Sequence, residues 1–177
     1  MIIVNLCGGL GNQMFQYAFG DTINHETGIE VKYTIDTFRY YESKRSFLLN
    51  EIFNLNLPIA HKKDIIECIG WKRQHSLTRR LLATNKFSKL RGSNFFVDYD
   101  ITSSELLYNY TAKNSYYYGH WCSEKYFKNN RERILDRFVF CKGTDGVTRL
   151  IADEIMKKES IAVHIRRGDY LTSKKHS

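Results

Sequence analysis

Two adjacent arginines near the end of the sequence are the residues best suited to bind an anion. They lie in the segment HIRRGDY (164–170), directly after a short apolar run. On an extended strand alternate residues share a face, so His164 and Arg166 point together and Arg167 points away. A guanidinium group fits two phosphate oxygens and stays charged, as a diphosphate requires. We predict an anion site here, with Asp169 holding one arginine or accepting from a ligand hydroxyl; a simple Arg–Asp169 ion pair is the alternative.

A glycine-rich turn near the N-terminus offers a second place for an anion. Gly8, Gly9 and Gly11 follow another apolar run, and Asn12 comes next. Glycines let the backbone turn tightly and approach a ligand, and the start of a helix presents unpaired N–H groups. The alternative is a turn whose glycines serve packing only.

The same turn matches a dinucleotide-binding fingerprint only in part. The fingerprint G-x-G-x-x-G needs a third glycine where this chain has Met14. Asp36 stands near the end of the next predicted strand, where a ribose-binding acid would lie. The missing glycine counts against a nicotinamide-dependent oxidoreductase, which stays open as an alternative.

An aromatic run, YYYGHW (116–121), could contact a sugar. Aromatic rings stack on the apolar faces of sugar rings, and tyrosine hydroxyls and the indole N–H add hydrogen bonds. Tyr118, His120 and Trp121 are therefore candidate acceptor-binding residues. The competing interpretation is a strand with a half-buried aromatic face.

The elements that carry the glycine turn form a βαβ unit. Residues 2–6 are a short apolar run typical of a buried parallel strand. Apolar residues then recur at three- and four-residue intervals over 12–25, which predicts an amphipathic helix ended by Gly28. Alternation over 29–35 predicts a second strand. Strand, glycine turn, helix and strand predict an α/β fold with a Rossmann-like arrangement.

The remaining elements are less regular. FLLNEIFNLNL (47–57) predicts a short helix or a packed loop, and Ser123 is a plausible N-cap of a helix reaching about Phe138. Thr144 is a second candidate N-cap, for a helix ending near Lys158. The apolar segment SIAVHI (160–165) predicts a buried strand that delivers the two arginines to its C-terminal end, where open α/β sheets bind ligands.

The positive charge is concentrated in one stretch. The chain carries a formal net charge of +8, and no acidic residue lies between Glu67 and Asp98. Seven of its bases fall within 72–91, and without them the net charge is +1. Leu77, Leu81 and Leu82 have near-helical spacing there, which predicts a helix packed through its leucines, with the bases, Arg79 included, in solvent or facing an anionic membrane. No motif supports binding of nucleic acid.

Composition and cysteine usage narrow the class further. The 177 residues, 42% apolar and 26% charged, fit a globular protein with one domain or with one domain and the start of another. The N-terminus lacks the pattern of a signal peptide, which predicts a cytoplasmic location. The four cysteines are far apart and read as reduced thiols, with no metal site at ligand spacing.

Three motifs together carry a family resemblance. GGLGNQMFQYAFG (8–20), GHWCSEKYF (119–127) and HIRRGDY (164–170) resemble the bacterial α-1,2-fucosyltransferases of glycosyltransferase family 11, as does RSFLLNEIFNL (45–55). The resemblance implies an inverting transfer of L-fucose from GDP-L-fucose to the 2-hydroxyl of a galactoside, in surface polysaccharide or O-antigen synthesis. It also implies a GT-B-like fold and no metal or other cofactor.

The resemblance implies roles for individual residues as well. Residues 1–140 would form the acceptor-side domain, and 141–177 a connecting helix and the first strand of a donor domain. The implied catalytic residues are Arg166, Asn12 and Asp169, and the implied donor-binding residues are His164, Arg166, Arg167, Gly9, Gly11 and Asn12. No general base stands out among Asp169, Glu124 and Asp36. The acceptor would be a galactose-containing, lipid-linked glycan, with peripheral membrane contact through residues 72–91 at the inner face of the membrane.

The resemblance covers less than a whole family member. Family members continue through a donor domain that contacts guanine and fucose, so we expect the 177 residues alone to show weak transfer or none. An inactive remnant and a sugar- or nucleotide-binding module remain alternatives to an enzyme.

Overall fold

Four short strands form one sheet in which all neighbours run parallel. The computed structural model describes residues 1–40, 45–100, 114–141, 143, 145–163 and 165. The sheet order is β2-β1-β4-β3, so the N-terminal strand lies in the interior of the sheet. The strands are β1 (Ile2–Asn5), β2 (Val31–Thr34), β3 (Phe95–Val97) and β4 (Ser115–Tyr118). The predicted α/β class with a parallel, Rossmann-like sheet is confirmed.

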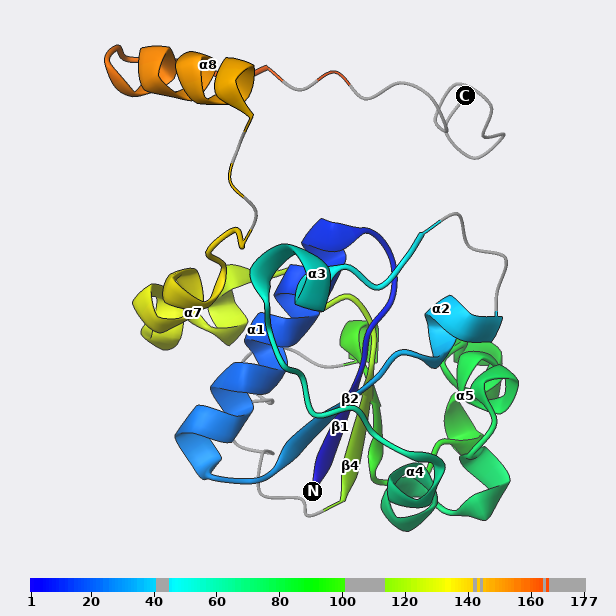
Figure 1. The fold of residues 1–177 in the computed structure, drawn as a ribbon. Coiled ribbons are helices and arrows are strands. Elements are labelled where there is room, and N and C mark those ends of the chain that lie inside the picture. Colours follow the sequence, from blue (N-terminus) through cyan, green and yellow to red (C-terminus); the bar gives the residue numbers. More distant parts are fainter. Residues whose placement is uncertain (41–44, 101–113, 142, 144, 164, 166–177) are drawn as a thin grey trace. The chain divides into compact units, whose positions relative to one another are not determined.

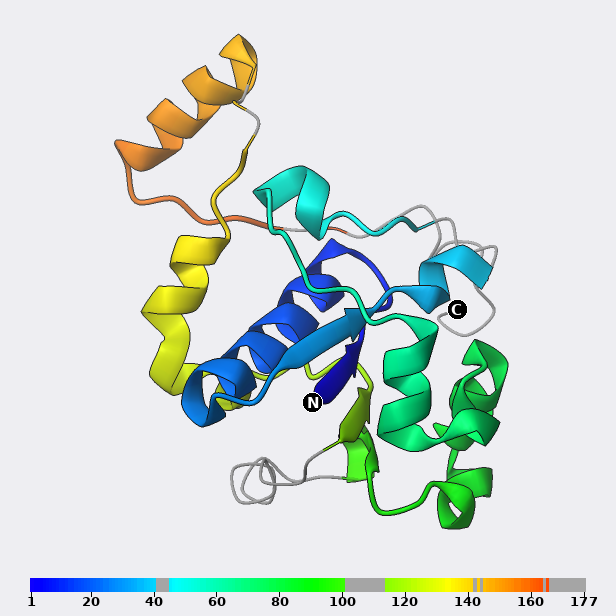
Figure 2. The same ribbon diagram turned by 60° about the horizontal axis from the view of Figure 1, so that its bottom comes forward.

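Helices cover both faces of this sheet (Figures 1 and 2). On one face lie α1 (Leu10–Thr27) and α3 (Leu49–Phe53), and on the other α4 (Lys62–Ile69) and α5 (Ser76–Leu82). Ile2 and Val4 pack with α1 and α3, whereas Ile3 packs with α4 and α5. This division follows from the strand geometry, in which successive side chains point to opposite faces.

The chain divides into two compact units, Met1–Cys141 and Lys142–Ser177. The assignment of such units to an acceptor side and a donor side stays a prediction. None of the described helices is long and apolar enough to cross a membrane. The other described elements are α2 (Asp36–Tyr40), α7 (Arg131–Arg137), α8 (Gly146–Met156), η1 (Trp71–Arg73), η2 (Asn85–Leu90), η3 (Asp98–Asp100), η4 (Glu124–Tyr126) and η5 (Lys128–Asn130).

The predicted N-terminal βαβ unit is confirmed. Gly28 ends α1 with a left-handed φ of 67°, and its N–H donates to Asn24 O at 2.9 Å. Gly20 lets α1 pack closely on β2, because a Cβ there would lie 2.7 Å from the hydroxyl oxygen of Tyr33. The predicted short helix within 47–57 is also present, as α3.

The predicted helix over the basic stretch is wrong in its length and in the face that it buries. Residues 71–90 form three short helical pieces, η1, α5 and η2. Leu77 and Leu81 are 63% and 55% exposed, whereas Arg79 is only 1% exposed and Leu82 is buried. Arg79 takes the inward position because the half-buried Asp36 carboxylate and two carbonyl groups accept hydrogen bonds from its guanidinium. The prediction from charge, that Arg79 faces solvent and the leucines face the core, is therefore wrong for Arg79, Leu77 and Leu81.

The helix predicted over 123–138 is broken. Ser123 does cap its first turn, accepting from Lys125 N at 3.4 Å. The turn ends at Phe127, whose φ of −139° is not helical and whose ring contacts Phe15 on α1 with centroids 5.8 Å apart. A second contact follows where Asn130 Nδ2 donates to Glu26 Oε1 at 2.7 Å. These contacts with α1 bend the segment into η4, η5 and α7.

The second unit differs from its prediction in two ways. The helix begins at Gly146, where Asp145 is the N-cap and accepts from Thr148 N at 2.7 Å; Thr144 lies outside the described residues. The described residues of the predicted strand, 160–163 and 165, are not a strand, and Ile161 is 93% exposed. A strand exists only by pairing with a neighbour, and no described strand pairs with this segment.

Candidate functional site

The candidate site is the edge of the sheet where the four parallel strands end. Cys7 and the glycine turn follow β1, Asp36 follows β2, and Asp98 follows β3. The segment after β4 contributes His120 and Cys122. Open α/β sheets bind ligands at this edge, because the turns leading out of the strands meet there.

The glycine turn presents the start of α1 without a protein cap. Gly9 is the N-cap residue, no side chain caps the helix, and its first turn carries no acid. The first intrahelical bond runs from Gln13 N to Gly9 O, so the N–H groups of Leu10, Gly11 and Asn12 have no acceptor within the helix. Unpaired N–H groups at the start of an 18-residue helix favour an anion.

The glycines of this turn differ in the space around them: one is tightly surrounded, and two have room for a side chain. Gly8 has a φ of 81°, and a Cβ there would lie 2.4 Å from Asn12 Nδ2, so its glycine is required by the fold. A Cβ at Gly11 would meet no atom within 4 Å, and one at Gly9 only Arg45 Nη1 at 3.9 Å. Packing within the described residues therefore does not explain Gly9 and Gly11.

Arg45 is a cation beside this turn that the sequence analysis did not single out for binding. A Cβ at Gly9 would lie 3.9 Å from Arg45 Nη1. Burial raises the pKa of the nearby Cys7 thiol, and the Arg45 charge opposes this rise only weakly. Arg45 begins the segment 45–55 that carries part of the family resemblance. Its place in this segment was the only signal in the sequence that could have identified Arg45 as a candidate.

Two buried glutamines on α1 hold the turns in place. Gln13 Nε2 donates to Gly8 O at 3.1 Å and Ser46 O at 2.9 Å, and its Oε1 accepts from Leu48 N at 3.0 Å. Gln16 Oε1 accepts from Cys7 N, and its Nε2 donates to Gly119 O, both at 2.9 Å. Both glutamines are fully buried, although the apolar stripe predicted for this helix is not centred on either of them. No pattern in the sequence therefore marked them for this role.

The segment after β4 returns to the glycine turn. His120 N donates to Asp98 Oδ2 at 2.7 Å, which joins the ends of β3 and β4. Cys122 Sγ lies 3.8 Å from Asn12 Oδ1, and Cys7 Sγ lies 3.7 Å from His120 Nδ1. Segments 110 residues apart in the sequence thus meet at one edge of the sheet.

The candidate acceptor residues occupy different environments. His120 is exposed at this edge. Trp121 is 1% exposed and stacks on Phe19, with centroids 4.5 Å apart, and its backbone is left-handed with a φ of 54°. Tyr118 is half-buried and stacks with Phe95 at 6.3 Å. The burial of Trp121 favours a packing role for it, and contact of these three residues with a sugar stays a prediction.

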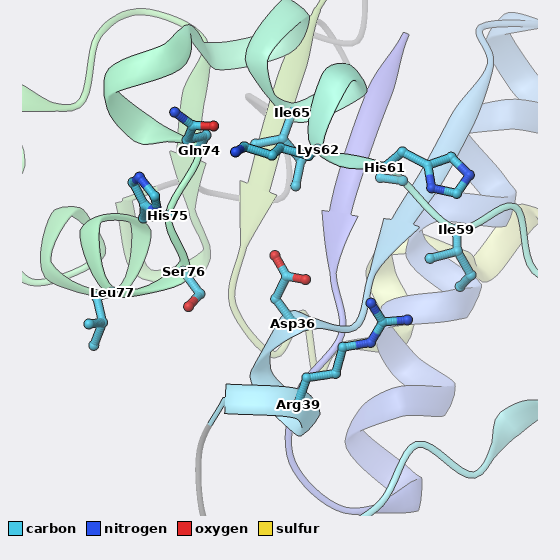
Figure 3. Close-up of a pocket in the computed structure, with 11 residues that line it drawn as sticks. Asp36, Arg39, Ile59, His61, Lys62, Ile65, Gln74, His75, Ser76 and Leu77 are labelled. Carbon is cyan, nitrogen blue, oxygen red and sulfur yellow. The ribbon is translucent and has the colours of Figure 1, made fainter.

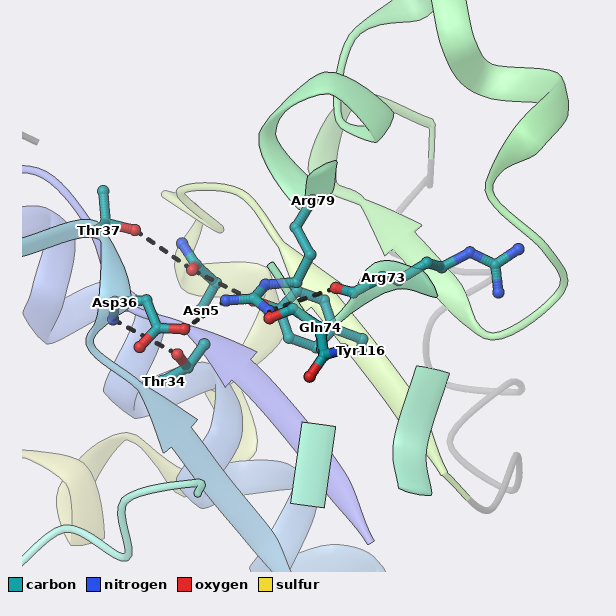
Figure 4. A network of polar contacts seen from close by, with 8 residues as sticks. All are labelled: Asn5, Thr34, Asp36, Thr37, Arg73, Gln74, Arg79 and Tyr116. Atoms are coloured by element: carbon teal, nitrogen blue, oxygen red, sulfur yellow. Dashed lines mark hydrogen bonds and ion pairs between the residues drawn. The ribbon is translucent and has the colours of Figure 1, made fainter. Parts of the chain in front are cut away.

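The end of β2 is closed by an ion pair (Figure 4). Arg79 Nη2 lies 2.5 Å from Asp36 Oδ2, and its Nη1 donates to the carbonyl oxygens of Arg73 and Gln74. Its guanidinium carbon also lies 5.5 Å from the centre of the Tyr116 ring. Asp36 is therefore committed to Arg79, which counts against a ribose-binding role and against the oxidoreductase alternative.

The carboxylates considered as a general base can now be compared. Glu124 is exposed and lies 3.3 Å from Arg131 Nε, and Asp36 is paired with Arg79. Asp98 is half-buried at the candidate site and also lines a pocket of about 270 Å³ with Trp121, Cys122 and Tyr126. Asp98 carries no clear signal in the sequence, because the strand that ends before it has only three residues.

The cysteines and the possible metal ligands show what further chemistry the site could support. All four cysteines are free, and burial raises the pKa of the Cys7 and Cys122 thiols, which disfavours thiolate chemistry. Among the described residues, no three His, Cys, Asp or Glu side chains gather to hold a metal ion; the absence of a metal remains a prediction. The predicted donor-binding residues His164, Arg166 and Arg167 and the predicted catalytic Asp169 lie outside the described residues.

Comparison with known proteins adds independent information. The model of the family described as glycosyl transferase family 11 matches residues 1–177. An α-1,2-colitosyltransferase from Escherichia coli is 30% identical over 174 residues, which cover 98% of this chain and 56% of the relative. The chain thus spans about half the length of that curated relative. No solved structure matches the chain significantly.

Proposed function

Because the chain belongs to glycosyltransferase family 11, we propose that it takes part in the inverting transfer of L-fucose from GDP-L-fucose to the 2-hydroxyl of a galactoside. The acceptor is a galactose-containing glycan of a surface polysaccharide or O-antigen, carried on a lipid. The protein acts in the cytoplasm at the inner face of the membrane.

One observation carries this proposal. The glycine turn and the segment after β4 hold two of the motifs that resemble the family, and they meet where Asn12 approaches Cys122. The open glycines beside them leave room for a ligand against the backbone. An exposed edge with unpaired N–H groups and a nearby arginine suits the diphosphate of a sugar nucleotide.

The chemistry follows from this arrangement. In the transfer, the bond between the anomeric carbon and the β-phosphate oxygen breaks, and a bond to the galactose 2-oxygen forms on the opposite face. The start of α1 and Arg45 stabilise the charge that develops on the diphosphate, which lowers the barrier. The family resemblance implies a role at the donor phosphates for Arg166 as well. The proton of the 2-hydroxyl goes to a carboxylate, and we assign Asp98 to this step because it is the half-buried acid beside His120.

A second donor is favoured by a specific finding. The E. coli relative transfers colitose according to its name, and 30% identity does not separate one donor sugar from another. A nucleotide-activated colitose is therefore the alternative substrate for the same site.

Contact with a membrane is supported by exposed apolar side chains as well as by charge. Leu77 and Leu81 are exposed one helical turn apart on α5, with the basic Arg80 between them. Exposed leucines among bases suit insertion into the headgroup region of an anionic membrane.

The test is a transfer assay of a chain extended to the relative's length, with GDP-L-fucose or the colitosyl donor and a β-galactoside, and with product linkage and anomeric configuration determined by NMR. We expect an α-1,2 product. Arg166→Ala should lower its rate about 10²–10³-fold, the usual cost of one preorganised charge-stabilising donor. Asn129→Ala, at an exposed position in η5, serves as the control and should leave the rate unchanged.

One outcome would reject the proposal. If neither donor is used by the 177 residues or by a chain extended to the relative's length, the protein is not this transferase. Calorimetric titration with GDP, GDP-L-fucose and NAD then distinguishes the alternatives: GDP binding without transfer indicates a binding module, and NAD binding indicates an oxidoreductase.

A further inference from the structure

A second pocket lies beside β2, away from the glycine turn (Figure 3). Its volume is about 790 Å³, within the range of small-molecule sites. Figure 3 shows side chains of three elements around the same space: Arg39 from α2, Lys62 from the start of α4, and Ser76 from the start of α5. From this pocket we propose that the protein binds an anionic group, phosphate or carboxylate, of its glycan acceptor.

The charge of the lining supports an anion. Arg39 and Lys62 are exposed, and within the described residues neither has an ion-pair partner. The acid in the lining is Asp36, whose charge is already neutralised by the buried Arg79. The pocket therefore keeps two unneutralised cations, which attract an anion.

The other lining groups suit a sugar. His61, His75 and Ser76 can donate or accept hydrogen bonds from hydroxyl groups. Ile59 and Ile65 add apolar surface of the kind that packs against the faces of a sugar ring. This mixture of cations, neutral polar groups and apolar surface indicates an acidic saccharide more than a free inorganic ion.

The position indicates an acceptor and not the donor. The pocket lies among α2, α4 and α5, beyond the Asp36–Arg79 pair, whereas the donor diphosphate in the proposed function lies at the glycine turn after β1. The Asp36–Arg79 pair lies at the end of β2 and closes that strand's end to a second nucleotide. This assignment rests on the proposed function, since it interprets the acidic saccharide as the sugar acceptor.

The test is calorimetric titration of the 177-residue chain with galactose 1-phosphate, galacturonic acid and methyl β-D-galactoside. The variant Arg39→Ala/Lys62→Ala removes the two exposed cations and should fold normally. It should bind the preferred charged sugar about tenfold more weakly, while the neutral galactoside is unaffected. The matched control Lys125→Ala/Lys128→Ala removes two exposed cations elsewhere and should bind like the wild type.

The two charged probes separate a phosphate from a carboxylate as the preferred group. Unchanged binding in the double variant, or an equal loss in the control, would overturn the proposal. Displacement of the charged sugar by GDP would overturn the acceptor assignment, because the pocket would then be a donor site. If a chain extended to the relative's length transfers no sugar while charged sugars still bind through Arg39 and Lys62, the proposed function fails and the acceptor assignment fails with it, whereas the anion-binding pocket stands.

Discussion

The ends of β1 and β2 are neighbours in one sheet, yet one is open and the other is closed. At the end of β1, Gly9 and Gly11 leave space and unpaired N–H groups. At the end of β2, Asp36 is covered by the guanidinium of Arg79, which is almost fully buried. Both ends have the topology that binds ligands in α/β proteins.

The topology offers a site at both ends, and the side chains there decide whether a ligand can occupy it. The protein supplies its own cation at the end of β2, so that end stabilises the fold. At the end of β1 no side chain of the described residues covers the glycine turn in this way, so that end remains available to a ligand.

Removal of Arg79 should have the largest effect, because it opens the closed end. Arg79→Ala leaves Asp36 and two carbonyl groups without their buried donor. We expect a loss of about 3 kcal/mol in the free energy of unfolding, as for other broken buried ion pairs. Urea denaturation followed by circular dichroism measures this loss.

The control for Arg79 comes from the same basic stretch. Lys89→Ala removes an equal charge at an exposed position and should change the stability by less than about 0.5 kcal/mol. Equal losses in the two variants would mean that Arg79 is not part of a closed end.

The next largest effect concerns Gln16, the buried side chain that holds the turn after β1. Gln16→Leu leaves the N–H of Cys7 and the carbonyl of Gly119 unpaired in the interior. We expect a destabilisation of about 2 kcal/mol, together with faster amide hydrogen exchange at Cys7. Asn129→Leu, which changes an exposed amide, provides the comparison. Unchanged exchange at Cys7 would contradict the role given to Gln16.

A smaller change partly fills the open end. Gly11→Ala adds a methyl group where no protein atom lies within 4 Å, so the fold should gain about 0.5 kcal/mol from better helix propensity. The affinity for GDP, measured by calorimetry, should nevertheless fall about tenfold if the diphosphate approaches this backbone. Gly146→Ala, at another open helix start, should leave GDP affinity unchanged. Unchanged affinity in Gly11→Ala would place the diphosphate elsewhere.

The smallest effect belongs to a second ion pair on β2. Lys32 Nζ lies 3.0 Å from Asp64 Oδ1, and the N–H of His61 together with Lys32 lowers the pKa of Asp64. A lowered pKa stabilises the fold above the ordinary carboxyl value of about 3.9, and this contribution disappears as the pH falls through the lower folded value. Asp64→Asn should therefore cost about 1 kcal/mol at pH 7 and less below pH 4. A loss that does not depend on pH would exclude this explanation.

The first βαβ unit could be predicted because its signals are local. Alternation, helical spacing and the terminal Gly28 each depend on a few neighbouring residues, and the structure has strand, helix and strand where these signals place them. The open turn between β1 and α1 was predicted for the same reason. The family resemblance was also available from short motifs, and the family match confirms it.

Other features could not be predicted because they depend on distant partners. Arg79 is buried only because Asp36 lies 43 residues earlier in the chain. Asp98 joins the site only through the amide of His120, and the break at Phe127 depends on a ring on α1. Such contacts leave no periodic trace in the sequence.

The position of β1 in the sheet has a consequence for how the protein is made. β1 pairs with β2 on one side, but its other partner, β4, begins about 80 residues after β2 ends. At a synthesis rate of 5–20 residues per second, this interval is about 4–16 s. During that time one edge of the apolar strand β1 has no partner on the ribosome, and another nascent chain could pair with it. Expression should therefore depend on chaperones that shield an unfinished sheet more than on the stability of the finished one.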